Sequence, residues 1–139
     1  MGRERVASAV VLAVILIGAG GAAAQTPPAI ASGYAAAARQ EAPEFNGFSV
    51  QRGEAFFQST HGGEWSCASC HTRNPLAPGQ HAKTAKTIAP LAPAANADRF
   101  TSLATVEKWF RRNCNDVVGR ACTAREKGDV LVYLMQLKP

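Results

Sequence analysis

The stretch "EWSCASCH", residues 64–71, contains the most specific pattern in the sequence. Cys67 and Cys70 stand three residues apart, and His71 follows the second cysteine directly. This spacing is the attachment signature of a c-type haem, in which both thiols bond to the cofactor and the adjacent imidazole binds the iron. We therefore predict one covalently attached haem c held by Cys67, Cys70 and His71.

The four cysteines also allow other interpretations. Cys67 and Cys70 could form a redox-active pair, or a zinc site completed by Cys114, Cys122 or a histidine. Cys114 and Cys122 lie eight residues apart in "RRNCNDVVGRAC", so they could equally close a small loop. A disulfide there would stabilise the fold by about 2.5 kcal/mol on the chain-entropy estimate, and it would hold Asn113 and Asn115 in a fixed turn.

The second axial position of the iron is the open question. Small electron-carrier cytochromes usually fill it with a methionine sulfur. This chain has only two methionines, Met1 and Met135. Met1 is expected to be removed with an export signal, and Met135 lies within an apolar helical stripe, which is typical of a core residue. Neither sulfur is expected to bind the iron.

Other side chains could take that position. His81 lies in a long loop and could reach the iron, which would give a bis-histidine electron carrier. His61 stands six residues before Cys67 and is expected on the same side of the haem as His71, or on the surface. An asparagine amide oxygen is an unusual iron ligand, and composition alone ranks Asn113 below His81.

The first 24 residues are predicted to be a secretory signal peptide. A charged start is followed by a short apolar run and then by small residues before Gln25, the order of segments found in such signals. The expected mature domain, residues 25–139, carries a formal charge of +4, because the signal removes two arginines and one glutamate. A mild positive charge suits docking to an acidic protein. No basic run is interleaved with aromatic residues, which argues against nucleic acid as a partner.

The mature domain is predicted to be mainly α. Helical spacing or composition favours helices over 27–40, 48–61, 102–114 and 123–137. The last of these begins with a capping box, in which Glu126 follows Thr123 by three residues. It then carries a broad apolar stripe, formed by Val130, Leu131, Leu134, Met135 and Leu137. Gly53 is expected to let the second helix cross the last one closely, near residues 128–132. Residues 72–100 follow no helix or strand period, and so long a loop is expected to wrap the haem edge. Its lysines, Lys83 and Lys86, are expected in solvent or near the haem propionates.

The sequence resembles the sphaeroides haem protein (SHP) group of monohaem cytochromes c. The likeness runs from about residue 30 to the C-terminus, and it is carried by "SCASCH", "KTIAPLAP", "DRFTSLATVEKWFRRNCNDVVGRAC" and "EKGDVLVYL". The resemblance implies a class I cytochrome c fold. Transferred residue by residue, it implies His71 and Asn113 as the axial ligands and a disulfide between Cys114 and Cys122. Asn115 is the nearest rival to Asn113.

The resemblance also implies a function. Members of this group accept electrons, lose the asparagine ligand when reduced, and bind diatomic gases such as O2, NO and CO. The group is associated with a dihaem cytochrome c and a membrane cytochrome b as redox partners, and the signal peptide implies a periplasmic location. Whether the protein reduces its gas ligand, as a small terminal reductase, is left open. The alternatives are an ordinary electron carrier with a stable second ligand, and a gas-binding or sensing module without turnover.

Overall fold

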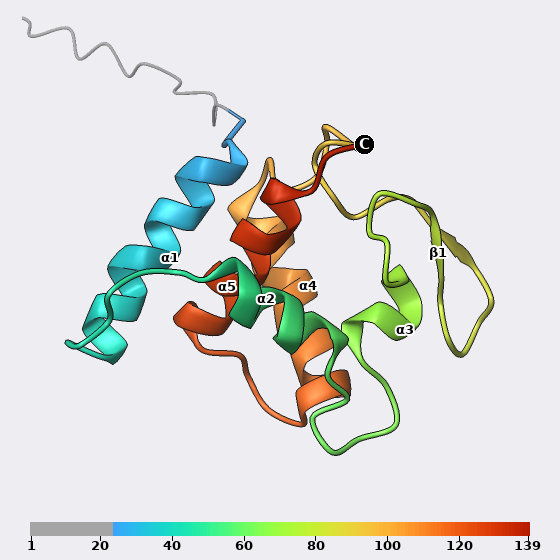
Figure 1. The fold of residues 1–139 in the computed structure, drawn as a ribbon, viewed down its shortest axis with the longest axis horizontal. Coiled ribbons are helices and arrows are strands. Elements are labelled where there is room, and N and C mark those ends of the chain that lie inside the picture. Colours follow the sequence, from blue (N-terminus) through green and yellow to red (C-terminus); the bar gives the residue numbers. More distant parts are fainter. Residues whose placement is uncertain (1–23) are drawn as a thin grey trace, which may run out of the picture.

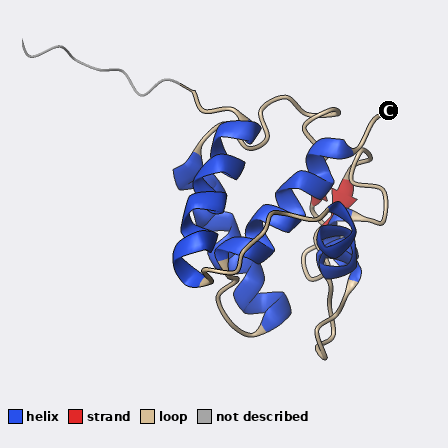
Figure 2. Cartoon of the chain, turned by 60° about the vertical axis from the view of Figure 1, so that its left-hand side comes forward, coloured by secondary structure: helices blue, strands red, loops and turns tan. Residues whose placement is uncertain are grey.

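The computed structural model describes residues 24–139, and this part of the chain is mainly helical, as predicted (Figures 1 and 2). Its elements are α1 (Pro27–Glu41), α2 (Val50–Gln58), α3 (Cys67–His71), β1 (Gly79–Gln80), β2 (Thr87–Ile88), α4 (Leu103–Val118) and α5 (Ala124–Gln136). None of the described helices is long and apolar enough to cross a membrane. The predicted signal peptide lies outside the described residues, apart from its last residue, Ala24.

Helix α5 is the centre of the fold and packs against both α1 and α2 (Figure 1). Its apolar stripe is buried as predicted, with Leu131 and Leu134 almost fully removed from solvent. The helix begins with a capping box, in which the Thr123 backbone N–H donates to Glu126 Oε2 at 2.8 Å and the Glu126 N–H donates to Thr123 Oγ1 at 3.2 Å. The sequence thus determines both where α5 starts and which face it buries.

The crossing of α2 over α5 depends on Gly53. A Cβ atom placed on Gly53 would lie 2.0 Å from the backbone oxygen of Asp129, so only glycine allows this approach. The close crossing predicted for Gly53 is therefore confirmed. An ion pair stabilises the same crossing of α2 and α5: Arg52 Nε donates to the buried carboxylate of Asp129 at 2.7 Å. The Ser49 N–H donates to the same carboxylate, also at 2.7 Å.

Helix α4 is longer than predicted, and this corrects the sequence analysis. The prediction ended the helix at Cys114 and placed Asn113 and Asn115 in a turn, whereas the helix continues to Val118. Residues 113–118 contain no glycine or proline, and their modest helix propensities are not enough to stop a helix that is already formed. It ends where Gly119 takes a left-handed conformation, with φ of +74°, and donates its N–H to Asn115 O.

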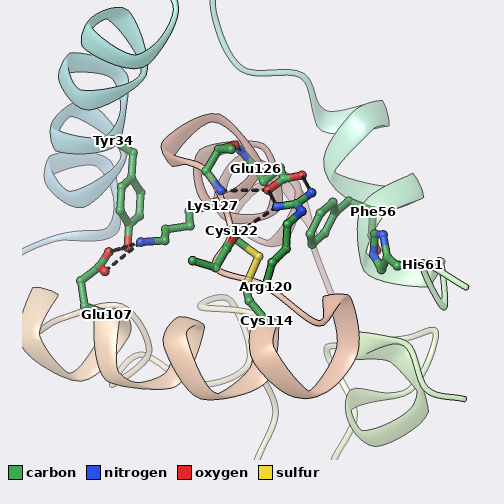
Figure 3. The surroundings of a disulfide bond; sticks show 11 residues. Tyr34, Phe56, His61, Glu107, Cys114, Arg120, Cys122, Glu126 and Lys127 are labelled. Atoms are coloured by element: carbon green, nitrogen blue, oxygen red, sulfur yellow. Dashed lines mark hydrogen bonds and ion pairs between the residues drawn. A yellow bond between two sulfur atoms is a disulfide. The ribbon is translucent and has the colours of Figure 1, made fainter. Parts of the chain in front are cut away.

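Side-chain contacts hold α4 against the rest of the fold at two positions along the helix (Figure 3). Near its start, Glu107 accepts hydrogen bonds from Tyr34 of α1 at 2.6 Å and from Lys127 of α5 at 2.8 Å. Further along, a disulfide joins Cys114 of α4 to Cys122, just before α5. The part of α4 between Glu107 and Cys114 is therefore held in a defined position.

The connection from α3 to α4 contains a short element that the sequence analysis did not predict. β1 and β2 form an antiparallel ladder, with Gly79 opposite Ile88 and Gln80 opposite Thr87. Two residues in each strand are too few to produce an alternating hydrophobic pattern. The ladder folds residues 81–86 back beside α3.

Candidate haem-binding site

The cysteines and the histidine of the CxxCH motif share one short helix, α3. Ser66 caps it: the Ser66 backbone N–H donates to Ser69 Oγ at 2.9 Å, and the Ser69 N–H donates to Ser66 Oγ at 3.2 Å. At helical spacing, residues three and four apart lie on one face. Cys67, Cys70 and His71 accordingly line the same cavity, and both cysteines are free thiols.

This cavity has a volume of about 420 Å³ and lies between α3, α4 and the α2–α5 pair. Most of its wall is apolar, including Phe57 of α2, Trp65 before α3, Val106 of α4 and Leu134 of α5. The loop predicted to wrap the haem edge contributes residues as well; those at the cavity are His81, Ala82, Lys83, Thr84, Lys86, Ile88, Leu91, Asp98, Arg99 and Phe100. Two thiols and an imidazole at one side of an apolar cavity are the donor set that a covalently bound haem requires.

The electrostatics of the cavity suit His71 as a metal ligand. Burial lowers the pKa of His71 to about 4, and the positive charge of Arg99 acts in the same direction. The imidazole is therefore neutral at neutral pH, the form in which a ring nitrogen can bind iron. Burial also raises the pKa of the Cys67 thiol to about 11, so that this group is uncharged as well.

Helix α4 turns Asn113 toward the cavity. Val106, Trp109, Phe110 and Asn113 are spaced as i, i+3, i+4 and i+7, and all four line the cavity. Asn115 lies outside this face and borders a separate surface depression with Arg111. Because α4 continues beyond Cys114, Asn113 lines the cavity and Asn115 does not. Without the family resemblance, the residues alone did not distinguish the two asparagines.

The other ligand candidates differ in where they lie. His61 is not among the residues that line the cavity: its Nε2 is 2.9 Å from Phe56 O and its ring packs against the Phe56 ring. Met135 packs against the core formed by α1, α4 and α5, as predicted. His81 does line the cavity, and its Nδ1 accepts hydrogen bonds from the backbone N–H groups of Lys83 and Thr84, each at 3.3 Å.

Two residues beside the haem motif were missed by the sequence analysis. Gly79 of β1 is buried against α3, where a Cβ atom would lie 2.0 Å from Cys70 O. Arg99 lines the cavity and donates hydrogen bonds to Ala89 O and Pro90 O. A lone glycine in a loop rich in proline gives no sequence signal of a close contact. Arg99 lies within a stretch that carries the family resemblance, but no role was assigned to it there.

The disulfide beside Asn113 joins the two cysteines that the resemblance pairs (Figure 3). Replacing Cys122 by serine should lower the free energy of unfolding by about 2–4 kcal/mol. The last turn of α4 would loosen as well, so the ferric absorption spectrum should shift together with the urea unfolding midpoint. The double variant Cys114→Ser with Cys122→Ser removes the same bond and should lose the same amount. Unchanged stability in both variants would contradict the prediction.

Comparisons with known proteins show which proteins this chain resembles. Residues 43–134 match a family described as a domain of unknown function, DUF1924. The chain is 44% identical over 128 residues to cytochrome c-type protein SHP of Cereibacter sphaeroides, covering 89% of this chain and 94% of that protein. It is 39% identical over 111 residues to cytochrome c'' of Methylophilus methylotrophus, covering 76% of this chain and 77% of that protein.

Solved structures give the same result. Oxidized SHP, described as an oxygen-binding cytochrome c, superposes with a TM-score of 0.71 at 44% identity, covering 80% of this chain and 96% of that one. Oxidized cytochrome c'' of Methylophilus methylotrophus superposes with a TM-score of 0.72 at 35% identity, covering 81% of this chain and 95% of that one. A solution structure of the same cytochrome, which concerns haem-ligand detachment, superposes with a TM-score of 0.70 at 35% identity. It covers 81% of this chain and 94% of that one. The predicted cytochrome c-like fold is confirmed, and the chain belongs to the family of monohaem c-type cytochromes that includes SHP and cytochrome c''.

Proposed function

We propose that this cytochrome is exported to the periplasm, binds one haem c covalently through Cys67 and Cys70, and holds the ferric iron between His71 and Asn113. On reduction Asn113 leaves the iron, and the open position takes a diatomic ligand such as O2, NO or CO. The observation that carries the proposal is that Cys67, Cys70, His71 and Asn113 line one apolar cavity, whose lining contains no methionine.

The chemistry of the two ligands explains a switch that depends on redox state. When bound, the haem supplies a redox-active iron with two axial positions. The neutral His71 ring is a strong ligand in both redox states. The Asn113 amide is a hard oxygen donor, which favours ferric iron and holds ferrous iron weakly. Within residues 24–139 no side chain donates a hydrogen bond to the Asn113 amide oxygen, so only the iron would hold it in place.

Two features of the relatives support this proposal. SHP is described as an oxygen-binding cytochrome c, and the solution structure of cytochrome c'' concerns detachment of a haem ligand. For electron delivery we propose a dihaem cytochrome c, itself supplied by a membrane cytochrome b. Lys83 and Lys86, both exposed at the cavity, would face the acidic surface of such a partner. Reduction of the bound gas, which would make the protein a small terminal reductase, is compatible with this site.

The ferrous absorption spectrum tests the proposal directly. Reduced protein should show high-spin, five-coordinate iron, and CO should convert it to a low-spin complex. His81→Ala should behave like the wild type. A low-spin ferrous spectrum that CO does not alter, but that becomes high-spin in His81→Ala, would instead establish an ordinary bis-histidine carrier, the alternative favoured by the position of His81 at the cavity.

Covalent attachment is tested separately, because it depends on Cys67 and Cys70 alone. After treatment with acidified acetone, the colour should stay with the polypeptide. Extraction of the pigment into the solvent would contradict the thioether bonds. A turnover assay with a reduced donor protein and O2 or NO then separates a reductase from a module that only binds gas.

A further inference from the structure

Arg99 is one of the cations that line the same cavity as His71. It stands in the loop between β2 and α4, and its side chain is partly buried. Its guanidinium is fixed by two backbone carbonyls: Nε donates to Pro90 O at 2.9 Å and Nη2 donates to Ala89 O at 2.7 Å. These two contacts hold the planar group in one orientation at the cavity wall.

The charge of this guanidinium has no anionic partner within residues 24–139. The ion pairs of the described residues involve Arg52, Arg120 and Lys127, and none includes Arg99. Asp98 and Asp116 line the same cavity without pairing with it. Of the five N–H donors of an arginine, three are left without a protein acceptor there. A partly buried cation with free donors is unfavourable unless an anion meets it.

The other cations at the cavity are placed differently. Lys83 lies over the ring of Trp65, with Nζ 4.6 Å from the ring centroid. Arg112 is exposed and lies 5.4 Å from the centroid of Trp109. Lys86 is exposed as well. Arg99 alone among them is partly buried and oriented by backbone acceptors, which is how proteins prepare a guanidinium to bind a carboxylate.

We propose that Arg99 is the charge partner of a haem propionate and thereby helps to set the redox potential of the iron. The inference rests on the proposed function in one respect, namely that haem c occupies this cavity. A propionate is a carboxylate, and it would accept hydrogen bonds from the free donors of Arg99. The positive charge of Arg99 would also make the ferric iron less favourable relative to the ferrous iron, because the ferric form carries one more positive charge.

The test is a redox titration of haem-loaded variants. Arg99→Gln removes the charge and should lower the equilibrium constant for reduction at least tenfold, a shift of about 59 mV toward negative potential for one electron. Arg99→Lys keeps the charge and should shift less. Arg73→Gln is the matched control, because Arg73 is exposed and within residues 24–139 its side chain donates a hydrogen bond only to Gln58, at 3.4 Å. It should change the constant less than twofold. Arg112→Gln tests the rival cation and should shift less than Arg99→Gln.

A second measurement reads the contact itself. In resonance Raman spectra the propionate bending band should move to lower frequency in Arg99→Lys, because a lysine cannot reproduce the planar fork of donors. This needs only wild type and Arg99→Lys, so it remains decisive if Arg99→Gln fails to take up haem. An unmoved band, an unchanged potential in loaded Arg99→Gln, or equal shifts in Arg99→Gln and Arg99→Lys would overturn the assignment to Arg99. Absence of covalent haem from the wild type would instead defeat the proposed function.

Discussion

Replacing Asn113 by alanine should remove the proposed oxygen ligand from the ferric iron and leave a high-spin five-coordinate or water-ligated centre. Asn113 shares the cavity with His71, and alanine has no oxygen with which to bind the metal. The ferrous CO complex should change little, because the proposed function has Asn113 already detached in that state. The ferric absorption and electron paramagnetic resonance spectra measure the first effect, and CO binding measures the second.

Asn115→Ala is the matched control for this prediction. Asn115 is two residues from Asn113 on the same helix but borders a different part of the surface. Its loss should leave the ferric spectrum unchanged and cost little stability. An unchanged ferric spectrum in Asn113→Ala, with the change found in Asn115→Ala or His81→Ala instead, would show that the ligand has been assigned wrongly.

Replacing Gly53 by alanine should strongly destabilise the fold. The added methyl group would lie 2.0 Å from Asp129 O, 2.5 Å from the Asp129 carbonyl carbon and 3.0 Å from Tyr133 Cβ. Backbone atoms cannot move aside as the end of a side chain can, so α2 must separate from α5. Overpacking of a core typically costs about 1–3 kcal/mol, and we expect the upper end of that range or more. Urea unfolding at equilibrium measures it.

Gly33→Ala controls for the helix propensity of the added methyl group. Gly33 is exposed within α1, and nothing lies within 4 Å of its hypothetical Cβ. Alanine there should stabilise the protein by about 0.5–1 kcal/mol, because glycine is a poor helix former. If Gly53→Ala were as stable as the wild type, the close crossing of α2 and α5 could not hold in solution.

The sequence predicts the parts of this protein that depend on local pattern. The capping box at Thr123, the apolar stripe of α5 and the glycine crossing at Gly53 were all predicted from residue type and spacing. The CxxCH motif likewise places Cys67, Cys70 and His71 on one short helix, and their spacing of three and four residues puts them on one face of it.

The parts that could not be predicted depend on where a helix ends and on contacts distant in the sequence. Once α4 is known to reach Val118, the spacing from Val106 to Asn113 places Asn113, and not Asn115, on the helix face that lines the cavity. The low helix propensities of the residues around Cys114 gave no indication that the helix continues beyond it. Arg99 was missed for a different reason. Its partners Ala89 and Pro90 are backbone acceptors, which leave no trace in residue type.

The helical setting of Asn113 has a consequence for reaction rates. A ligand carried by a flexible loop can leave the iron by moving its backbone, on a scale of nanoseconds to microseconds or slower. Asn113 instead lies between two anchors of α4, the contact of Glu107 with Lys127 and the disulfide of Cys114. If Asn113 is the ligand proposed above, its departure would need only rotation of the side chain, which takes picoseconds to nanoseconds once the bond to iron is broken. We therefore expect opening of the gas site to keep pace with the arrival of the electron, so that delivery of the electron by the partner controls when gas can bind.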